Sequence, residues 1–203
     1  SREGAFGWPA RPALASHTLP ELFQEAGYAT GLFSNSIMIR DPGFLAGFET
    51  ARFVGRSQMV SQQSVPLTRA ALDFVKRAGE RPFFLYLHYL DPHGPYEPPP
   101  RFREAFPTEP VEAPLALYGE VRDRCSELRA EGFGPGEARF EDLRARYDAE
   151  IAYTDHALRL LLLGLRQAGR ADDTVIVVTS DHGEEFLEHG YVEHAWTLYE
   201  ESL

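Results

Sequence analysis

The run Thr174-Val175-Ile176-Val177-Val178-Thr179 constrains the fold more than any other segment of the chain. It is β-branched throughout and has no polar alternation. β-Branched residues favour strands, and a strand without a polar side is typical of a sheet that is covered on both faces. We therefore predict a buried strand over residues 174–179, in a sheet with helices on both faces.

Helical and strand patterns alternate along the rest of the chain. Apolar residues recur at helical spacing in residues 18–26, 65–78 and 140–167, and Thr18 is placed to cap the first helix. Apolar runs at 28–34 and 83–89 follow the first two helices, and 174–179 follows the third. Helix then strand, repeated three times, predicts an α/β fold with a largely parallel sheet.

Polar side chains follow each of these strands. The three segments are Ser34-Asn35-Ser36, Asp91-Pro92-His93 and Ser180-Asp181-His182. Ligands of α/β sheets bind beyond the carboxyl ends of the strands, so we expect the three segments to share one site.

Two regions interrupt the alternation. The prolines between Asp91 and Pro114 exclude helix and central strand, which predicts a long loop, and such loops are usually functional. The polar segment within residues 115–140 is expected to be an exposed helical insertion that contains Cys125. Residues 1–203 as a whole are predicted to be one partial domain.

Charge and cysteine content exclude some partners. The net charge of −11 argues against binding of nucleic acid or anionic lipid, and no apolar run approaches the roughly 20 residues of a membrane span. The single cysteine cannot form an internal disulfide, which leaves periplasmic, secreted and cytoplasmic locations open.

Asp181 and His182 are the strongest candidates for chemistry. A carboxylate and an imidazole on adjacent residues of a turn suit a divalent cation, because both are standard ligands. In the alternative interpretation, Asp181 caps a following helix and His182 has no function. The two residues alone leave both interpretations open.

Four segments resemble the sulfatase family of the alkaline-phosphatase superfamily. Thr179 to Glu184 resembles the family's second metal-binding segment. The continuation resembles the stretch that follows this segment in many members, through Glu188-His189-Gly190, His194 and Leu198 to Glu201. Tyr86 to Tyr96 resembles the strand and loop that carry a substrate histidine. Two further matches are Thr18–Leu22 with Ala26–Thr30, and Tyr147–Ile151 with Asp155. The matches follow the family's order and leave out only residues near 111–140.

The resemblance implies an alkaline-phosphatase/sulfatase-like fold and metal-dependent hydrolysis of a sulfate ester. Asp181 and His182 would be metal ligands. His93 and His194 would be catalytic and would contact the substrate anion, with His93 able to protonate the leaving oxygen. Asn35 would either donate a hydrogen bond to the anion or form a strand-end turn, since the Gly-Lys-Trp-His of many arylsulfatases is replaced here by Phe33-Ser34-Asn35-Ser36.

Other residues are expected to play supporting roles. Glu184 and Glu185 are expected to be solvated residues or residues that contact a ligand of the site. An acid–base role is disfavoured, because an unpaired carboxylate near a bound anion is repulsive. Tyr147, Asp148 and Asp155 are expected to hold the long helix in place. His189 lies in a similar motif but has no separate physical task.

The family nucleophile is a Cys or Ser in a Cys/Ser-x-Pro-x-Arg context, where it is converted to formylglycine. Gly7-Trp8-Pro9-Ala10-Arg11 has the spacing but no side chain to modify, and Cys125 lacks the following Pro and Arg. We therefore expect an internal fragment without the nucleophile segment, the first aspartate pair of the metal site and the C-terminal part, and inactive by itself. Ca²⁺ is the expected ion, with Mn²⁺ or another transition metal as alternatives that suit imidazole better.

Two alternative functions stay open at this point. One is a phosphodiester or phosphonate-monoester hydrolase or phosphotransferase of the same superfamily, and the other is a non-catalytic sulfatase-like domain that binds a partner or sugar. The expected substrate is a small-molecule or glycan sulfate ester, or the corresponding phosphate ester.

Overall fold

The computed structural model describes residues 17–36, 38–40, 42–54, 62–112, 114–115, 120–194 and 197–202. The segment Gly7–Arg11, considered above as a nucleophile motif, lies outside this range. No helix within the described range is long and apolar enough to cross a membrane.

The centre of the fold is a parallel three-stranded sheet with the order β2-β1-β3. β1 spans Ala29–Ser34, β2 spans Thr50–Phe53 and β3 spans Phe83–His88. Every residue of the central strand β1 is buried. The register pairs Ser34 with His88, so the carboxyl ends of β1 and β3 lie side by side.

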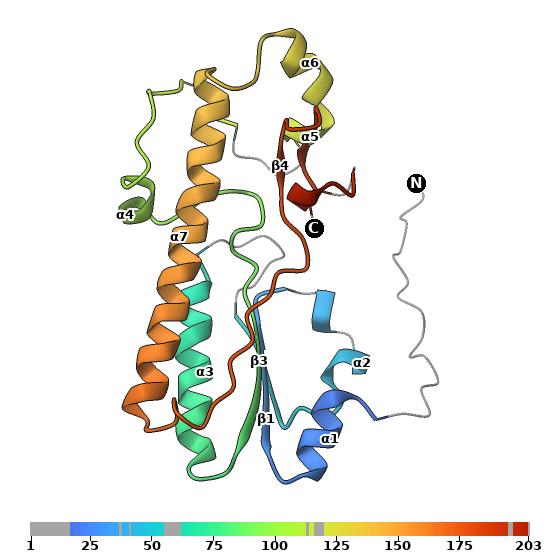
Figure 1. The fold of residues 1–203 in the computed structure, drawn as a ribbon, viewed down its shortest axis with the longest axis vertical. Coiled ribbons are helices and arrows are strands. Elements are labelled where there is room, and N and C mark those ends of the chain that lie inside the picture. Colours follow the sequence, from blue (N-terminus) through green and yellow to red (C-terminus); the bar gives the residue numbers. More distant parts are fainter. Residues whose placement is uncertain are drawn as a thin grey trace.

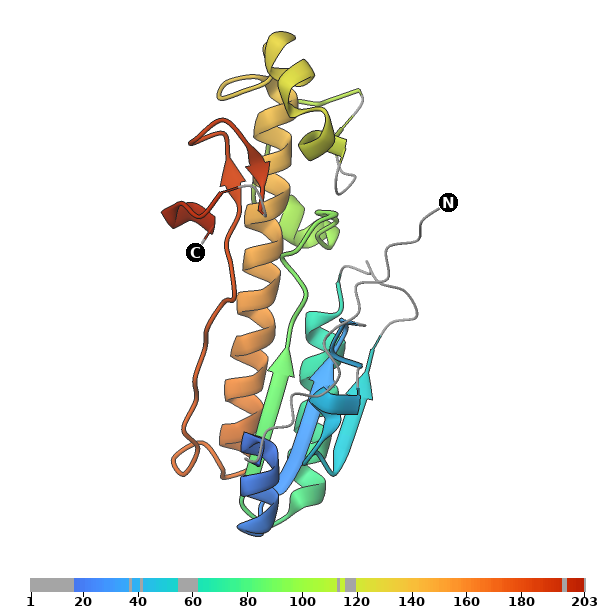
Figure 2. The ribbon, with the colours of Figure 1, turned by 90° about the vertical axis from the view of Figure 1, so that its right-hand side faces the viewer.

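Helices cover both faces of this sheet (Figures 1 and 2). α3 (Ser64–Ala78) packs on one face, where Phe74 lies 5.7 Å from Phe33 between ring centroids. α1 (Leu19–Glu25) packs on the other face, where Phe23 stacks on Phe84 at 4.5 Å. The predicted layered α/β architecture is confirmed, as is the cap of α1, where Thr18 and Glu21 form a capping box.

The long helix α7 (Ala138–Gln167) connects two hydrophobic cores. With 30 residues it is about 45 Å long, which is longer than the sheet it packs beside. Its C-terminal half contributes Leu161 and Leu165 to the core between α3 and the sheet. Its N-terminal half contributes Phe140 and Leu143 to a second core.

The second core is built from segments far apart in the sequence. α5 (Glu120–Asp123) and α6 (Cys125–Ala130) pack there against a short antiparallel hairpin of β4 (Glu185–Phe186) and β5 (Val192–Glu193). Cys125 is only 7% exposed because it belongs to this core, so the expectation of an exposed insertion is wrong for that residue. The helices themselves fall where the sequence indicated, while the limits of an insertion at 115–140 stay a prediction.

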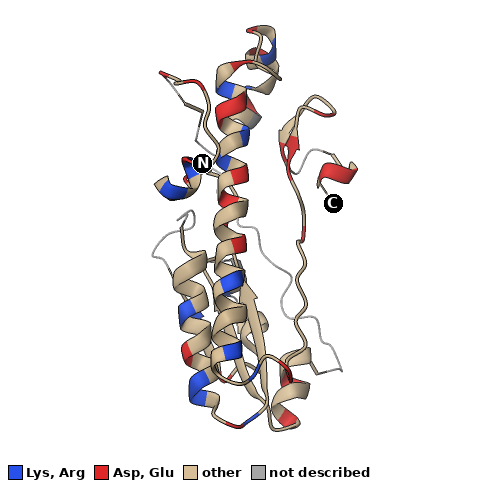
Figure 3. Ribbon diagram, turned by 60° about the vertical axis from the view of Figure 1, so that its left-hand side comes forward, with Lys and Arg blue, Asp and Glu red and all other residues tan. Residues whose placement is uncertain are grey.

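The predicted strand over residues 174–179 is not formed. Val175 is 91% exposed and Val177 is 82% exposed, and the segment makes no sheet pairing with any strand of the described range. A strand requires a hydrogen-bonding neighbour, which β-branched propensity alone cannot supply. The segment runs as an extended, uncharged connection from the end of α7 towards the hairpin (Figure 3).

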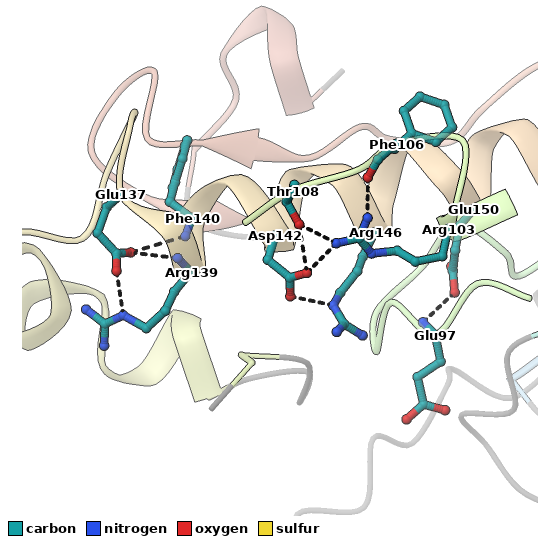
Figure 4. Close-up of polar contacts among 10 residues, drawn as sticks. All are labelled: Glu97, Arg103, Phe106, Thr108, Glu137, Arg139, Phe140, Asp142, Arg146 and Glu150. Atoms are coloured by element: carbon teal, nitrogen blue, oxygen red, sulfur yellow. Dashed lines mark hydrogen bonds and ion pairs between the residues drawn. The ribbon is translucent and has the colours of Figure 1, made fainter. Parts of the chain in front are cut away.

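The loop between Asp91 and Pro114 contains a short helix, α4 (Pro100–Arg103), which the sequence analysis excluded. Proline is tolerated in the first turn of a helix, where its missing N–H has no partner to lose. Arg103 donates to Thr108 and Asp142, and Arg146 donates to the same carboxylate, so the loop is fastened to α7 (Figure 4).

Several short elements were not predicted from the sequence. These are β2, the β4–β5 hairpin, α2 (Pro42–Leu45) and the 3₁₀ turns η1 (Met38–Arg40) and η2 (Glu200–Ser202). Each has four residues or fewer, which is too short for a periodic pattern.

Candidate active site

Three histidines from distant segments meet in the structure. His93 lies in the loop after β3, His182 in the turn after the extended 174–180 segment, and His194 directly after β5. The ring centroids of His182 and His194 are 3.9 Å apart, and His93 lies 5.2 Å from His194 and 6.3 Å from His182. The structure thus brings together the three histidines that the sequence analysis selected.

The loop that carries His93 is anchored by Asp91. This carboxylate is 3% exposed and accepts hydrogen bonds from the backbone N–H groups of Gln62, Gln63 and Ser64 at 2.8, 3.1 and 2.9 Å. It therefore caps the N-terminus of α3, whose own N-cap residue, Gln63, makes no capping hydrogen bond with its side chain. On the other side, the hydroxyl of Thr154 in α7 donates to the carbonyl of Asp91 at 3.2 Å.

His93 is held in one orientation and one tautomer. Its backbone N–H donates to the carbonyl of Leu90 at 2.7 Å, and its Nδ1 lies 2.8 Å from the carbonyl oxygen of Gly94. A carbonyl can only accept, so Nδ1 carries the hydrogen. Burial lowers the pKa of His93, against the opposing effect of the bond to Gly94. A neutral ring with its hydrogen on Nδ1 has a basic Nε2.

His182 and Asp181 have the chemistry of a pair of metal ligands. Nδ1 of His182 lies 3.1 Å from the carbonyl oxygen of Gly183, so in the neutral ring Nε2 keeps its lone pair. That Nε2 lies 3.9 Å from Oδ1 of Asp181, whose side chain is 85% exposed. One ion with ligand distances of about 2.0–2.4 Å can span two donors at this separation. The donor set therefore fits a divalent cation.

Glu184 orients His194 and increases its basicity. Oε1 of Glu184 lies 3.0 Å from Nδ1 of His194, and the Glu184 side chain is 4% exposed. This hydrogen bond raises the pKa of His194, although burial opposes the shift. Of the two roles expected for Glu184, the structure excludes a solvated carboxylate and shows contact with a histidine of the site. Donor atoms of His182, Glu184 and His194 all lie within 4.8 Å of one another.

Asn35 connects the end of β1 to the loop that carries His93. It is 3% exposed, and its Oδ1 accepts from the backbone N–H of Leu90 at 2.9 Å. Its Nδ2 is buried. Asn35 thus has a structural role at the strand end, and its amide NH2 group has no hydrogen-bond partner among the described residues.

His88 also lies at this end of the sheet, although it was not selected from the sequence. Nδ1 of His88 lies 2.9 Å from Oγ of Ser34, and burial lowers the pKa of His88 while the nearby Asp181 raises it. His88 belongs to a predicted strand, and only the register of β1 and β3 shows that it is near the site. His189 does not join the three histidines, because its Nδ1 faces Glu185 and Glu201.

The chain is similar in sequence to known proteins. A family model described as Sulfatase matches residues 5–203. A multifunctional alkaline phosphatase superfamily protein from Trinickia caryophylli is 30% identical over 140 residues, which is 60% of this chain and 27% of that protein. Human iduronate 2-sulfatase is 32% identical over 136 residues, which is 58% of this chain and 24% of that protein. The aligned region thus spans about a quarter of each relative's length.

Solved structures share the fold. A protein whose structure was solved in complex with its substrate D-glucosamine-2-N,6-O-disulfate superposes with a TM-score of 0.64 and 21% identity, covering 93% of this chain and 54% of that one. A phosphonate monoester hydrolase from Silicibacter pomeroyi superposes with a TM-score of 0.62 and 19% identity, covering 90% of this chain and 50% of that one.

Proposed function

Because this chain belongs to the sulfatase family of the alkaline-phosphatase superfamily, we propose that the full-length protein hydrolyses a sulfate ester with the help of a divalent cation. The observation that carries the proposal is the convergence of His93, His182 and His194 at one site. Each ring has its Nδ1 against an acceptor, which fixes the orientation of the ring. Such a set can bind an anion and move a proton.

Asp181 and His182 are proposed to hold the cation. When bound, the cation would neutralise charge on the substrate anion and lower the pKa of the attacking group. Ca²⁺ is the ion proposed first, and the imidazole of His182 would also suit Mn²⁺ or another transition metal. The nucleophile is proposed to be a formylglycine outside the residues of this chain.

His93, His194 and Asn35 are proposed to act on the substrate. His194 has a raised pKa and is the ring best suited to be cationic, so it would pair with the anion. His93 would contact the transferred group or protonate the leaving oxygen through Nε2. The buried Nδ2 of Asn35 would donate one hydrogen bond to the same anion.

A sulfated sugar is the proposed substrate class. Its support comes from relatives whose names include iduronate 2-sulfatase and N-sulphoglucosamine sulphohydrolase, and from the neighbour solved with a glucosamine disulfate. The chain's net charge of −11 gives no support to a nucleic-acid substrate.

The test uses the full-length protein and compares hydrolysis at sulfur with hydrolysis at phosphorus in matching esters. We expect faster hydrolysis of an aryl sulfate than of the matching aryl phosphate or phosphonate monoester, and loss of activity with a chelator. His93→Gln should lower kcat for the sulfate by about 10²- to 10⁴-fold, the range for a general acid–base residue. His17→Gln, at a half-exposed histidine of the N-terminal region, is the matched control. Equal rates for His93→Gln and wild type would contradict the assignment.

Hydrolysis at phosphorus is the second candidate. The observations that favour it are a histidine as the proposed metal ligand and the likeness to a phosphonate monoester hydrolase. It predicts the opposite preference in the same assay, with phosphonate monoesters or aryl phosphates turned over faster than aryl sulfates.

A non-catalytic binding domain is the third candidate, and metal binding separates it from the other two. If the site is functional, a divalent cation should raise the Tm of the full-length protein, and Asp181→Ala should abolish that rise. A Tm that does not depend on the cation would favour the non-catalytic domain.

A further inference from the structure

A second cluster of ligand-type side chains lies apart from the three histidines of the proposed active site. It consists of Glu185 at the start of β4, His189 in the hairpin loop and Glu201 in the turn η2. Nδ1 of His189 lies 3.1 Å from Oε1 of Glu185 and 3.5 Å from Oε2 of Glu201. We propose that Glu185, His189 and Glu201 bind a divalent transition-metal ion, with Zn²⁺ as the best-suited probe.

The spacing of the donor atoms matches a metal site. Donors that lie about 2.0–2.1 Å from a tetrahedral Zn²⁺ are separated from one another by about 3.3–3.4 Å. The two separations at His189 bracket this value, and one donor atom from each of the three residues lies within 4.8 Å of the others. The three side chains would need to move only slightly to coordinate an ion.

Two buried oxygens in the cluster have no hydrogen-bond partner within the described range. One is Oε2 of Glu185, whose side chain is 0% exposed, and the other is Oε2 of Glu201, the oxygen that faces His189. Buried carboxylate oxygens without a partner are costly, and a coordinated cation would satisfy them. These unsatisfied atoms are the observation, separate from the presence of acidic residues, that indicates a ligand.

The charge balance supports the same conclusion. Two carboxylates surround one imidazole, and the one that belongs to Glu185 is completely buried. A neutral imidazole would leave two negative charges in the cluster, which a divalent ion would neutralise. Imidazole together with carboxylate favours Zn²⁺ and similar ions over Ca²⁺.

The surroundings hold the ligands in place and give access to them. The ring of His189 stacks on Tyr199 with centroids 3.6 Å apart, and the hydroxyl of Thr197 donates to Oε1 of Glu185 at 2.8 Å. A cavity of about 570 Å³ borders His189, together with Cys125 and Arg129 of α6. An ion here would tie the β4–β5 hairpin to η2, and the cavity would let it enter.

The test uses the full-length protein with Asp181→Ala and His182→Ala, which removes the ion proposed for the active site. After chelation and dialysis against Zn²⁺, we expect this background to retain one Zn²⁺ per chain, measured by elemental analysis. Adding Glu185→Gln or His189→Gln should weaken Zn²⁺ binding by about 100-fold or more, since loss of even an outer partner of a ligand costs 10- to 100-fold. Glu201→Gln, at a less buried ligand, provides a variant that is easier to fold.

Glu188→Gln is the matched control. Glu188 is in the same hairpin, but its carboxylate accepts from the backbone N–H of Phe186 and it is not part of the cluster. The control should bind Zn²⁺ as the background does. The proposal is overturned if the background binds no Zn²⁺, if all three ligand variants bind it unchanged, or if the control loses it equally. None of these results depends on sulfate hydrolysis, so failure of this site and failure of the proposed function are distinguishable.

Discussion

At the scale of single residues, the histidines of the candidate site differ in the group that accepts a hydrogen bond from Nδ1. Gly94 and Gly183 offer carbonyls to His93 and His182, whereas Glu184 offers a carboxylate to His194. A neutral acceptor fixes the tautomer, and a charged acceptor also stabilises the protonated ring. Similar side chains in one site can therefore take different roles.

The raised pKa of His194 gives a prediction for pH dependence. The hydrogen bond to Glu184 raises this pKa in the folded state. The pair therefore stabilises the fold fully at pH values below the ordinary pKa of histidine. That contribution is lost as the pH rises through the raised pKa. In Glu184→Gln the pKa of His194 should fall, since burial then acts without the carboxylate. An NMR titration of the His194 ring in the chelated full-length protein measures this, and an unchanged pKa would contradict the role given to Glu184.

At the scale of elements, the site depends on contacts between segments that have little regular structure. The loop before His93 is held by hydrogen bonds at the N-terminus of α3, and the turn at His182 lies directly against η2. A change in either contact should therefore alter both stability and the position of a histidine.

Asp91 is the first such contact. Asp91→Ala removes the carboxylate that accepts from three backbone N–H groups at the start of α3. Loss of a buried charged cap should lower the free energy of unfolding by about 2–3 kcal/mol. Denaturant unfolding measures the effect, and Asp73→Ala, at an exposed aspartate of α3, is the control. Equal stability of the two variants would show that Asp91 is not a cap.

Gly183 is the second contact. A Cβ at this position would lie 2.2 Å from the carbonyl oxygen of Glu201, so the glycine allows η2 to approach the turn at His182. Gly183→Ala should destabilise the fold by about 1–3 kcal/mol, the usual cost of overpacking. At Gly134 the nearest atom to a new Cβ is Cδ1 of Leu187 at an ordinary 3.7 Å, which makes Gly134→Ala the control in the same thermal unfolding experiment. A Gly183 variant as stable as this control would argue against the close approach.

At the scale of the whole molecule, the segment 174–180 leaves apolar side chains exposed to solvent. Val175, Val177 and Val178 are 91%, 82% and 68% exposed, although their sequence has the composition of a buried strand. This chain covers 54% of one solved structure that shares the fold and 50% of another. We expect a strand outside this chain to pair with residues 174–179 in the full-length protein.

Hydrogen exchange tests this expectation. The backbone amides of residues 175–178 should exchange slowly in the full-length protein, because paired amides are protected, and rapidly in the isolated 203-residue chain. The amides of the turn at Asp172 and Asp173 are the internal reference and should exchange rapidly in both. Rapid exchange of residues 175–178 in the full-length protein would show that the run remains unpaired.

The sequence by itself determined the elements whose pattern is local. The helices α1, α3 and α7 and the strands β1 and β3 lie where helical spacing, the Thr18 cap and apolar runs placed them, because those signals are contained within one segment. It also selected His93, His182 and His194, through strand ends and the family resemblance. Short elements such as β2 and the β4–β5 hairpin carry no such local signal.

Only the tertiary structure decided which of these residues meet and which are buried. It brought three distant histidines together, buried Glu184 and Glu185, placed His189 in a separate cluster, and left residues 174–179 without a partner strand among the described residues. The physical reason is the same in each case. Burial and strand pairing depend on segments far away in the chain, so no local pattern can specify them.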